Sequence, residues 1–182
     1  FEADGTPRAL VPGQIAQMTV LFPKSQAKVS DVWQVMGLRG TGSDDYEVSD
    51  LFVPQAYTYT RDFADDRRES GTLYRFSNFN LFGCAFAGIA IGIARAMMDD
   101  FVALASHKQG NSGLLRDNAA VQRDYGFNEV RLQSVRAYLY ATLESMWDTV
   151  DATGECSAAD RIMLRTATAF VIQSAKDVAD FV

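Results

Sequence analysis

The pattern of hydrophobic and polar positions divides this chain into two parts. Before residue 56, apolar side chains gather in short runs at residues 17–22, 29–35 and 46–53, close to turn-forming glycine or proline. Short runs rich in Val, Tyr, Phe and Thr between such residues are typical of β-strands. The last run alternates only in part, so we expect an irregular edge near Ser49 and Asp50.

After residue 72 the apolar positions repeat about every 3.6 residues, which is the period of an α-helix. The pattern predicts helices over residues 80–106 and 117–151, and a third that begins after Ser157. At 1.5 Å per residue the second would be roughly 50 Å long. Gly154 is a typical helix end, and Ser157 to Asp160 resembles a capping box. Long antiparallel helices joined by short links predict a bundle.

Each predicted helix carries a face that should pack. In the first, small side chains recur every four residues and should let another helix approach closely; they are Cys84, Gly88, Gly92 and Ala96. In the second, the predicted core stripe is Val121, Tyr125, Val135, Leu139, Leu143, Met146 and Val150. In the third it is Ile162, Met163, Ala167, Phe170, Val171, Val178 and Phe181. Arg95 and Arg136 interrupt apolar faces, where an ion pair is a simpler interpretation than a phosphate site.

Composition narrows the possible partners. The 17 basic and 23 acidic side chains give a net charge of -6, which disfavours nucleic acid and anionic lipid surfaces. Two cysteines make no disulfide framework, and reduced thiols suit a cytoplasmic location. The longest uninterrupted apolar stretch, residues 81–94, is shorter than the ~20 residues of a membrane span, so we expect a buried helix and no membrane contact. The first residue is not Met and the last lies in a helical pattern, which suggests a piece of a longer protein.

Several enzyme classes lack the residues that they need. His107 is the only histidine, so a Ser-His-Asp or Cys-His arrangement would depend on it, and no Gly-x-Ser-x-Gly motif occurs. The supply of ligands predicts no metal site. Gly37, Gly40 and Gly42 fit neither a dinucleotide fingerprint nor a phosphate-binding P-loop. The sequence therefore names no catalytic residue.

The Gly-Leu-Arg-Gly-Thr-Gly-Ser turn at residues 37–43 is the most distinctive local motif. Its glycines permit positive φ angles, and its successive N–H groups could converge on an acceptor. Thr41 and Ser43 add hydroxyl groups beside the charge of Arg39. The structural alternative is a plain strand connection in which Arg39 pairs with Asp44, Asp45 or a more distant carboxylate.

Three segments of the chain match, in order, motifs of one protein family. The first joins Trp33, the turn at residues 37–43 and Val53-Pro54. The second is Ala-Ile-Gly-Ile-Ala-Arg-Ala at residues 90–96, and the third is Ala-Val-Gln at residues 120–122, followed by Tyr-Gly. Together they cover nearly the whole chain and resemble the acyl-CoA dehydrogenase superfamily.

The resemblance implies an α+β fold and a domain organisation. Residues 1–55 would be the end of a β-barrel-like or β-sandwich domain, residues 56–71 a connecting segment, and residues 72–182 an incomplete antiparallel four-helix bundle. Family members hold a flavin, FAD or FMN, between these domains. Their bundles assemble a homotetramer in which neighbouring subunits complete the flavin sites.

The resemblance also implies candidate site residues. Those expected to bind the cofactor are Arg39, Thr41, Ser43, His107, Lys108 and Gln122, and those expected to line the substrate pocket are Trp33, Phe79, Phe82 and Phe86. Each has a structural alternative. Aromatic residues mainly supply buried area, His107 and Lys108 suit a solvated helix end, and Gln122 could bond only to its own surface.

Two enzymatic branches of the family compete. Some dehydrogenases place their glutamate base early in the first long helix, but residues 81–85 contain no acid. The family's Arg-x-x-Phe-Gly motif is also missing near residues 107–110. We therefore favour the hydroxylase-like branch: a two-component monooxygenase that uses O2 and reduced flavin from a separate reductase on an aromatic or heteroatom substrate.

Two alternatives to the monooxygenase stay open. One is an FAD-dependent dehydrogenase that desaturates an acyl-CoA between its α and β carbons. The other is a non-catalytic helical module for oligomerisation, since no base is identified. The isolated segment of 182 residues is expected to be inactive by itself.

Overall fold

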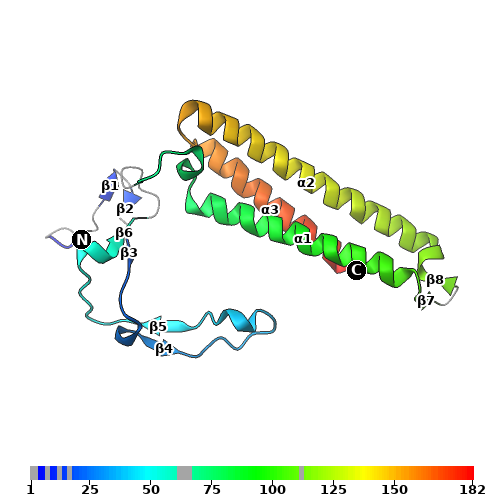
Figure 1. Ribbon diagram of the computed structural model, residues 1–182, viewed down its shortest axis with the longest axis horizontal. Helices are drawn as coiled ribbons and strands as arrows, with labels where there is room; N and C mark the ends of the chain where they lie inside the picture. Colours follow the sequence, from blue (N-terminus) through cyan, green and yellow to red (C-terminus); the bar gives the residue numbers. More distant parts are fainter. Residues whose placement is uncertain (1–3, 7–8, 12–13, 16–17, 61–66, 111–112) are drawn as a thin grey trace. The chain divides into compact units, whose positions relative to one another are not determined.

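The structure, a computed structural model, describes the chain apart from residues 1–3, 7–8, 12–13, 16–17, 61–66 and 111–112. The chain separates into two compact units, residues 1–67 and residues 68–182. The first holds short strands and the second is helical (Figure 1).

In the first unit the described strands pair two by two and are antiparallel. β1 (Ala9–Val11) pairs with β2 (Gln14–Ile15), β3 (Thr19–Val20) with β6 (Thr58–Tyr59), and β4 (Lys28–Ser30) with β5 (Asp45–Glu47). In the longest of these pairings Lys28 lies opposite Glu47 and Ser30 opposite Asp45.

These strands are shorter than the sequence pattern predicts, and local geometry gives the reason. The predicted run at residues 29–35 leaves the ladder after Ser30, because the backbone amides of Val32 and Trp33 donate to the Asp44 side chain instead. The run at residues 46–53 stops before Asp50, which has a positive φ of 49°. A left-handed residue cannot continue a strand, so the expected irregularity near Asp50 is confirmed.

In the second unit the described residues form three α-helices close to the predicted ranges. They are α1 (Asn78–Ala105), α2 (Ala119–Thr153) and α3 (Ala158–Phe181), which lie side by side, with α2 antiparallel to the other two (Figure 1). A small hairpin of β7 (Gln109–Gly110) and β8 (Gly113–Leu114) and a 3-10 turn, η6 (Leu115–Asp117), join α1 to α2.

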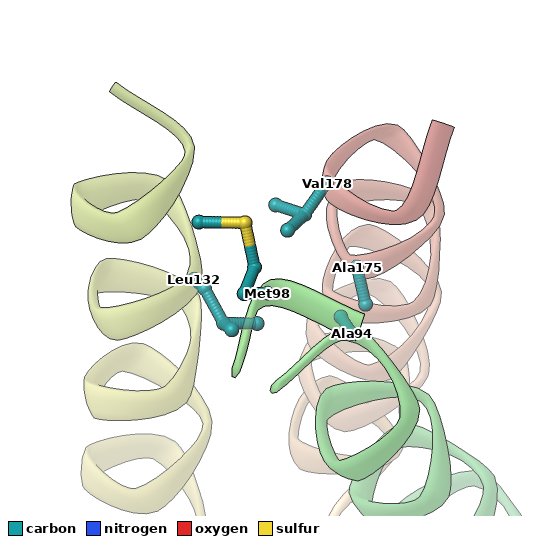
Figure 2. Packing of buried hydrophobic residues seen from close by; sticks show 5 residues of the cluster. All are labelled: Ala94, Met98, Leu132, Ala175 and Val178. Carbon is teal, nitrogen blue, oxygen red and sulfur yellow. The ribbon is translucent and has the colours of Figure 1, made fainter. Parts of the chain in front are cut away.

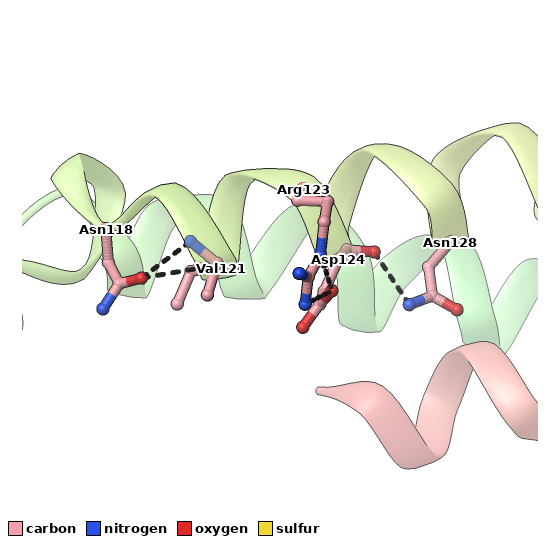
Figure 3. Close-up of polar contacts among 6 residues, drawn as sticks. Asn118, Val121, Arg123, Asp124 and Asn128 are labelled. Atoms are coloured by element: carbon pink, nitrogen blue, oxygen red, sulfur yellow. Dashed lines mark hydrogen bonds and ion pairs between the residues drawn. The ribbon is translucent and has the colours of Figure 1, made fainter.

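Local hydrogen bonds define the helix ends. The Ser77 hydroxyl accepts the Asn80 amide at the start of α1, and Asn118 Oδ1 accepts two amides at the start of α2 (Figure 3). Gly154 ends α2 with a φ of 82°. Ser157 and Asp160 form the predicted capping box at the start of α3. Such caps satisfy amides that have no partner inside the helix, typically for ~1 kcal/mol each.

The core of the helical unit lies between all three helices. Figure 2 shows Met98 of α1 meeting Leu132 of α2 and Val178 of α3. Farther toward the start of α1, Ala87 packs with Val135, Leu139 and Val171. The predicted stripe of α2 is confirmed at its buried positions, which are Val135, Leu139, Met146 and Val150, with Leu132 in addition.

Close approach of α1 and α3 corrects two packing predictions. Of the small face expected to pack, Cys84 packs against the core, but a Cβ atom at Gly88 or Gly92 would meet nothing within 4 Å. The contact uses Gly83 and the buried residues Ala87 and Ala94 instead. On α3 the predicted core residues Ile162, Met163 and Phe170 are exposed, and the buried positions are Leu164, Ala167, Thr168, Val171, Ser174, Ala175 and Val178. Closely spaced helices favour small side chains at their interface.

A long apolar face of α1 remains exposed. Phe82, Phe86, Ile89 and Ile93 are all more than half exposed. Length and composition alone would let this helix cross a membrane, a test that the core helix of a soluble protein also passes. The uninterrupted apolar stretch at residues 81–94 is shorter than a membrane span. The helix itself is longer, because it continues past Arg95 to Ala105. The expectation of a buried helix is therefore wrong for this face and right for the opposite one.

Candidate functional site

The glycine turn of the first unit has a defined internal structure. Gly37, Leu38 and Gly42 have left-handed φ angles of 78°, 50° and 53°. Between them, residues Arg39–Thr41 form a 3-10 turn, η2. For Leu38 this conformation is costly, since the left-handed region disfavours a branched side chain.

Hydrogen bonds to the Leu38 carbonyl oxygen account for the shape of the turn. It accepts the Thr41 amide at 3.1 Å, the Thr41 hydroxyl at 2.8 Å and the indole Nε1 of Trp33 at 2.9 Å. The Gly42 amide donates to the Arg39 carbonyl oxygen at 3.4 Å. The amides of Thr41 and Gly42 therefore point inward, and the indole ring of Trp33 is fixed by the turn.

Arg39 differs from its expected structural role. Asp44 accepts the amides of Val32 and Trp33, both at 3.2 Å. Within the described part of the chain Arg39 forms no ion pair with Asp44 or Asp45, so that pairing prediction is wrong. The exposed guanidinium of Arg39 remains available to an anion. Nearby in the chain, the hydroxyl groups of Thr41 and Ser43 lie 3.5 Å apart.

The other cofactor candidates lie at the far end of the α1–α2 pair, in the second unit. The amides of His107 and Lys108 both donate to the Leu104 carbonyl oxygen, and their side chains are exposed. The Gln122 side-chain amide donates to the Arg116 carbonyl oxygen at 2.7 Å. Gln122 thus bonds to its own surface, and the residue is exposed.

A pocket of about 340 Å³ adjoins these residues. Phe101 and Tyr125, whose stacked rings have centroids 6.3 Å apart, form one wall. Arg116, Ser106 and Gln122 bring polar groups to it. The pocket thus combines an aromatic wall with a cation, as a site for a planar anionic ligand requires.

The candidate substrate-pocket residues come from both units. Trp33 belongs to the first unit, and Phe79, Phe82 and Phe86 belong to α1. Phe82 and Phe86 lie on the exposed face of α1, so they are not core residues of this chain. Phe79 lines a groove between the starts of α1 and α3.

Arg95 is an ion-pair residue, as the simpler interpretation predicted. Its Nη1 lies 2.6 Å from Glu129 Oε2 on α2, and its Nη2 lies 2.9 Å from Asp99 Oδ1 on its own helix. The hydrogen bond from Arg95, followed by one from Gln133, lowers the pKa of Glu129. Arg136 stacks over the Tyr140 ring at 4.9 Å. The ion-pair interpretation is therefore confirmed for Arg95, whereas Arg136 makes a cation–π contact and no ion pair with any residue that the structure describes.

Sequence reasoning missed the polar groups of the groove that Phe79 lines. The groove has a volume of about 720 Å³ and includes Asn80, Arg161 and Arg165. Arg161 directly follows the capping box of α3, and Arg165 lies about one helical turn farther on. This spacing places both on one helix face, but by itself it is also typical of a solvated face.

Among the residues that the structure describes, no three side chains of His, Cys, Asp or Glu gather as a metal site would require. Cys84 and Cys156 are free thiols, and burial raises the pKa of each.

Comparisons with known proteins agree on one family. The family described as "Acyl-CoA dehydrogenase, C-terminal domain" matches residues 84–182. The indole-3-acetate monooxygenase of Pseudomonas putida is 29% identical over 161 residues, which are 87% of this chain and 41% of that protein. The chain therefore spans about two fifths of the length of this relative.

Two solved structures share the fold. The 3-HSA hydroxylase from Rhodococcus sp. RHA1 matches with a TM-score of 0.76 and 18% identity, over 93% of this chain and 46% of that one. XiaF from Streptomyces sp., solved in complex with FADH2 and glycerol, matches with a TM-score of 0.75 and 15% identity, over 96% and 46%. The match to the family's C-terminal domain extends over more than half of the chain, and this protein therefore belongs to the acyl-CoA dehydrogenase family.

Proposed function

We propose that the native protein is a flavin-dependent monooxygenase of the two-component type. The observation that carries the proposal is the similarity, over 87% of the chain, to a protein named as a monooxygenase. The solved structures that share the fold of this chain include a hydroxylase and a protein in complex with FADH2. In such a reaction one atom of O2 enters the substrate, the other leaves as water, and reduced flavin supplied by a reductase provides two electrons.

The described residues fit a flavin at two places, and FAD or FMN would suit both. Arg39 offers an exposed cation beside the fixed indole of Trp33. At the α1–α2 end, His107 and Lys108 are exposed near the aromatic-walled pocket that includes Gln122. A planar ring system with an anionic tail needs stacking surfaces and cations, and each place supplies both.

The dehydrogenase alternative is less well supported at α1. Residues 81–85 contain no carboxylate that could remove a proton from an acyl-CoA. Farther along the helix, Asp99 and the facing Glu129 of α2 are committed to Arg95. Carboxylates that balance a guanidinium are poor bases, because ion pairing stabilises their charged form.

We also propose that the exposed face of α1 contacts other copies of the chain in a homotetramer. Several large apolar side chains on one helix face exceed what a solvated helix normally exposes. The acidic net charge of -6 argues against an anionic membrane as the partner of this face. A cytoplasmic location stays part of the same proposal.

The decisive experiment is an anaerobic titration of the native protein with oxidised and with reduced flavin, followed by visible absorption. The proposal predicts selective uptake of the reduced form and, once O2 and an aromatic substrate are admitted, a hydroxylated product. Tight binding of oxidised flavin with desaturation of a thioester would support the dehydrogenase. If the protein bound neither oxidised nor reduced flavin, the result would support the non-catalytic oligomerisation module.

A further inference from the structure

The groove between the starts of α1 and α3 has the character of an anion site. We infer that it binds the carboxylate of an aromatic acid, which would be the substrate class of the protein. This inference rests on the proposed monooxygenase function. The groove is about 720 Å³ in volume, within the range of small-molecule sites, and all its lining residues belong to the helical unit.

Charge is the first argument. Arg161 and Arg165 both line the groove, and no Asp or Glu is found among its described lining residues. Ala158, the first residue of α3, also lines it, so the positive end of the helix dipole lies at the same place. The Asp160 carboxylate of the capping box offsets the helix dipole, so the positive charge of the groove comes from the two arginines.

The guanidinium groups of the two arginines differ in their hydrogen-bond partners. Arg161 donates from Nη1 to the Cys156 carbonyl oxygen at 2.7 Å, which holds its guanidinium in place and leaves its other nitrogens free. The guanidinium of Arg165 makes no hydrogen bond or ion pair with any residue that the structure describes, and only its backbone carbonyl oxygen accepts the Thr168 hydroxyl. A planar guanidinium without a partner is suited to bind a carboxylate through two parallel hydrogen bonds.

Asn80 adds a neutral polar group on the opposite wall. It is 6% exposed, and its Oδ1 accepts the Ser77 hydroxyl at 2.6 Å. The structure gives its amide nitrogen Nδ2 no partner among the described residues. Among the described residues only Arg95 Nε is a buried side-chain atom without a partner, so Asn80 Nδ2 is not an unsatisfied buried donor and is open to solvent or a ligand. Asn80 can donate from Nδ2 to the same anion as Arg165.

The remaining walls of the groove favour a ligand with an apolar body. They are formed mainly by apolar side chains, which are Phe79, Ile162, Leu164 and Ile172, with Gly83 at the helix contact. Free phosphate would leave these walls in water, whereas an aromatic acid would cover them. The apolar walls therefore favour a carboxylate on an aromatic body over a small inorganic anion.

Titration calorimetry on the native protein tests the inference with three probes: indole-3-acetate, its uncharged amide and inorganic phosphate. Arg165→Gln should weaken indole-3-acetate binding at least tenfold and leave binding of the amide unchanged, and Arg165→Lys should recover part of the loss. Arg123→Gln is the control, since Arg123 lies outside the groove and pairs only with its exposed neighbour Asp124 (Figure 3).

Two outcomes would overturn the inference. One is equal binding of indole-3-acetate by native protein and Arg165→Gln, including no binding by either. The other is binding of phosphate, lost in Arg165→Gln, with no binding of indole-3-acetate. Reduced flavin titrated into the same samples separates the proposals: flavin binding without an Arg165 effect rejects only the carboxylate site, and no flavin binding rejects the monooxygenase.

Discussion

At the scale of single residues, the Arg95–Glu129 pair is the strongest polar link between α1 and α2. The side chains are 35% and 24% exposed, and Arg95 Nε is buried without a hydrogen-bond partner in the described structure. Glu129→Gln should lower the free energy of unfolding by ~1–2 kcal/mol at pH 7, because a half-buried guanidinium loses its main charge partner. Urea denaturation followed by circular dichroism measures this.

Acid should remove the same stabilisation. The pKa of Glu129 is lowered from about 4.5 in the folded protein, so its charged form contributes stability above that pH and loses it as the pH falls through the lowered value. The gap in stability between native protein and Glu129→Gln should therefore shrink below pH 4.5. Asp124→Asn, which breaks an exposed pair on the same helix, should change stability by less than ~0.5 kcal/mol. Equal losses in the two variants would contradict the assignment.

Arg39 allows a test of function separate from stability. It makes no ion pair among the described residues and is exposed, so Arg39→Ala removes little packing. We expect the affinity for reduced flavin or substrate to fall about tenfold, as for one lost charge-assisted hydrogen bond, with the melting temperature within a degree or two of the native value. A lowered melting temperature with unchanged affinity would assign Arg39 to the fold alone.

At the scale of elements, two glycines of α1 should respond oppositely to alanine. A Cβ atom at Gly83 would lie 3.1 Å from Thr168 Oγ1, which is buried and bonded to two carbonyl groups of α3, so it cannot easily move. Gly83→Ala should destabilise the bundle by ~1 kcal/mol or more despite the better helix propensity of alanine. Gly92→Ala meets nothing within 4 Å and should be neutral or stabilising by up to ~1 kcal/mol.

Thermal melting of both variants decides between these effects. A stabilised Gly83→Ala would mean that α1 and α3 are less closely packed than described. A destabilised Gly92→Ala would instead place Gly92 in the proposed contact between copies, since the open space at this position is that of a single chain.

The same elements show what sequence alone could predict. The three helices and the caps at Gly154 and Ser157 follow from short-range patterns, and the structure confirms them. Choosing between Gly83 and Gly88 as the close-packed glycine required knowledge of where α3 lies. The ends of β4 and β5 depended on Asp44 and Asp50, through a side-chain bond and a positive φ that no periodicity encodes.

The candidate site shows the same limit. The resemblance singled out Arg39, His107, Lys108 and Gln122 by position in motifs, and they remain predictions. The groove of Arg161 and Arg165 was missed, because on a helix two arginines four residues apart look like an ordinary solvated face. Only the arrangement of α1 beside α3 places Asn80 and Phe79 with them around one cavity.

At the scale of the whole molecule, the exposed face of α1 is the surface through which we propose that copies of the chain assemble. Phe86, 62% exposed, lies between Phe82 and Ile89 on this face. If other copies cover it, Phe86→Glu should break the tetramer into smaller species, because a charge would be buried without a partner. Helix content should stay unchanged, since Phe86 makes no part of the described core clusters.

Sedimentation velocity measures the assembly, with Phe127→Glu on α2 as a control of similar exposure. A tetramer that survives Phe86→Glu but dissociates in Phe127→Glu would move the interface from α1 to α2. Flotation with uncharged phospholipid vesicles tests the membrane alternative on the same samples: native protein that floats, and Phe86→Glu that does not, would mean that lipid rather than another copy covers this face. The paired Arg95 leads us to expect no flotation, because a membrane-spanning α1 would have to carry Arg95, Asp99 and Asp100 into or across the hydrocarbon.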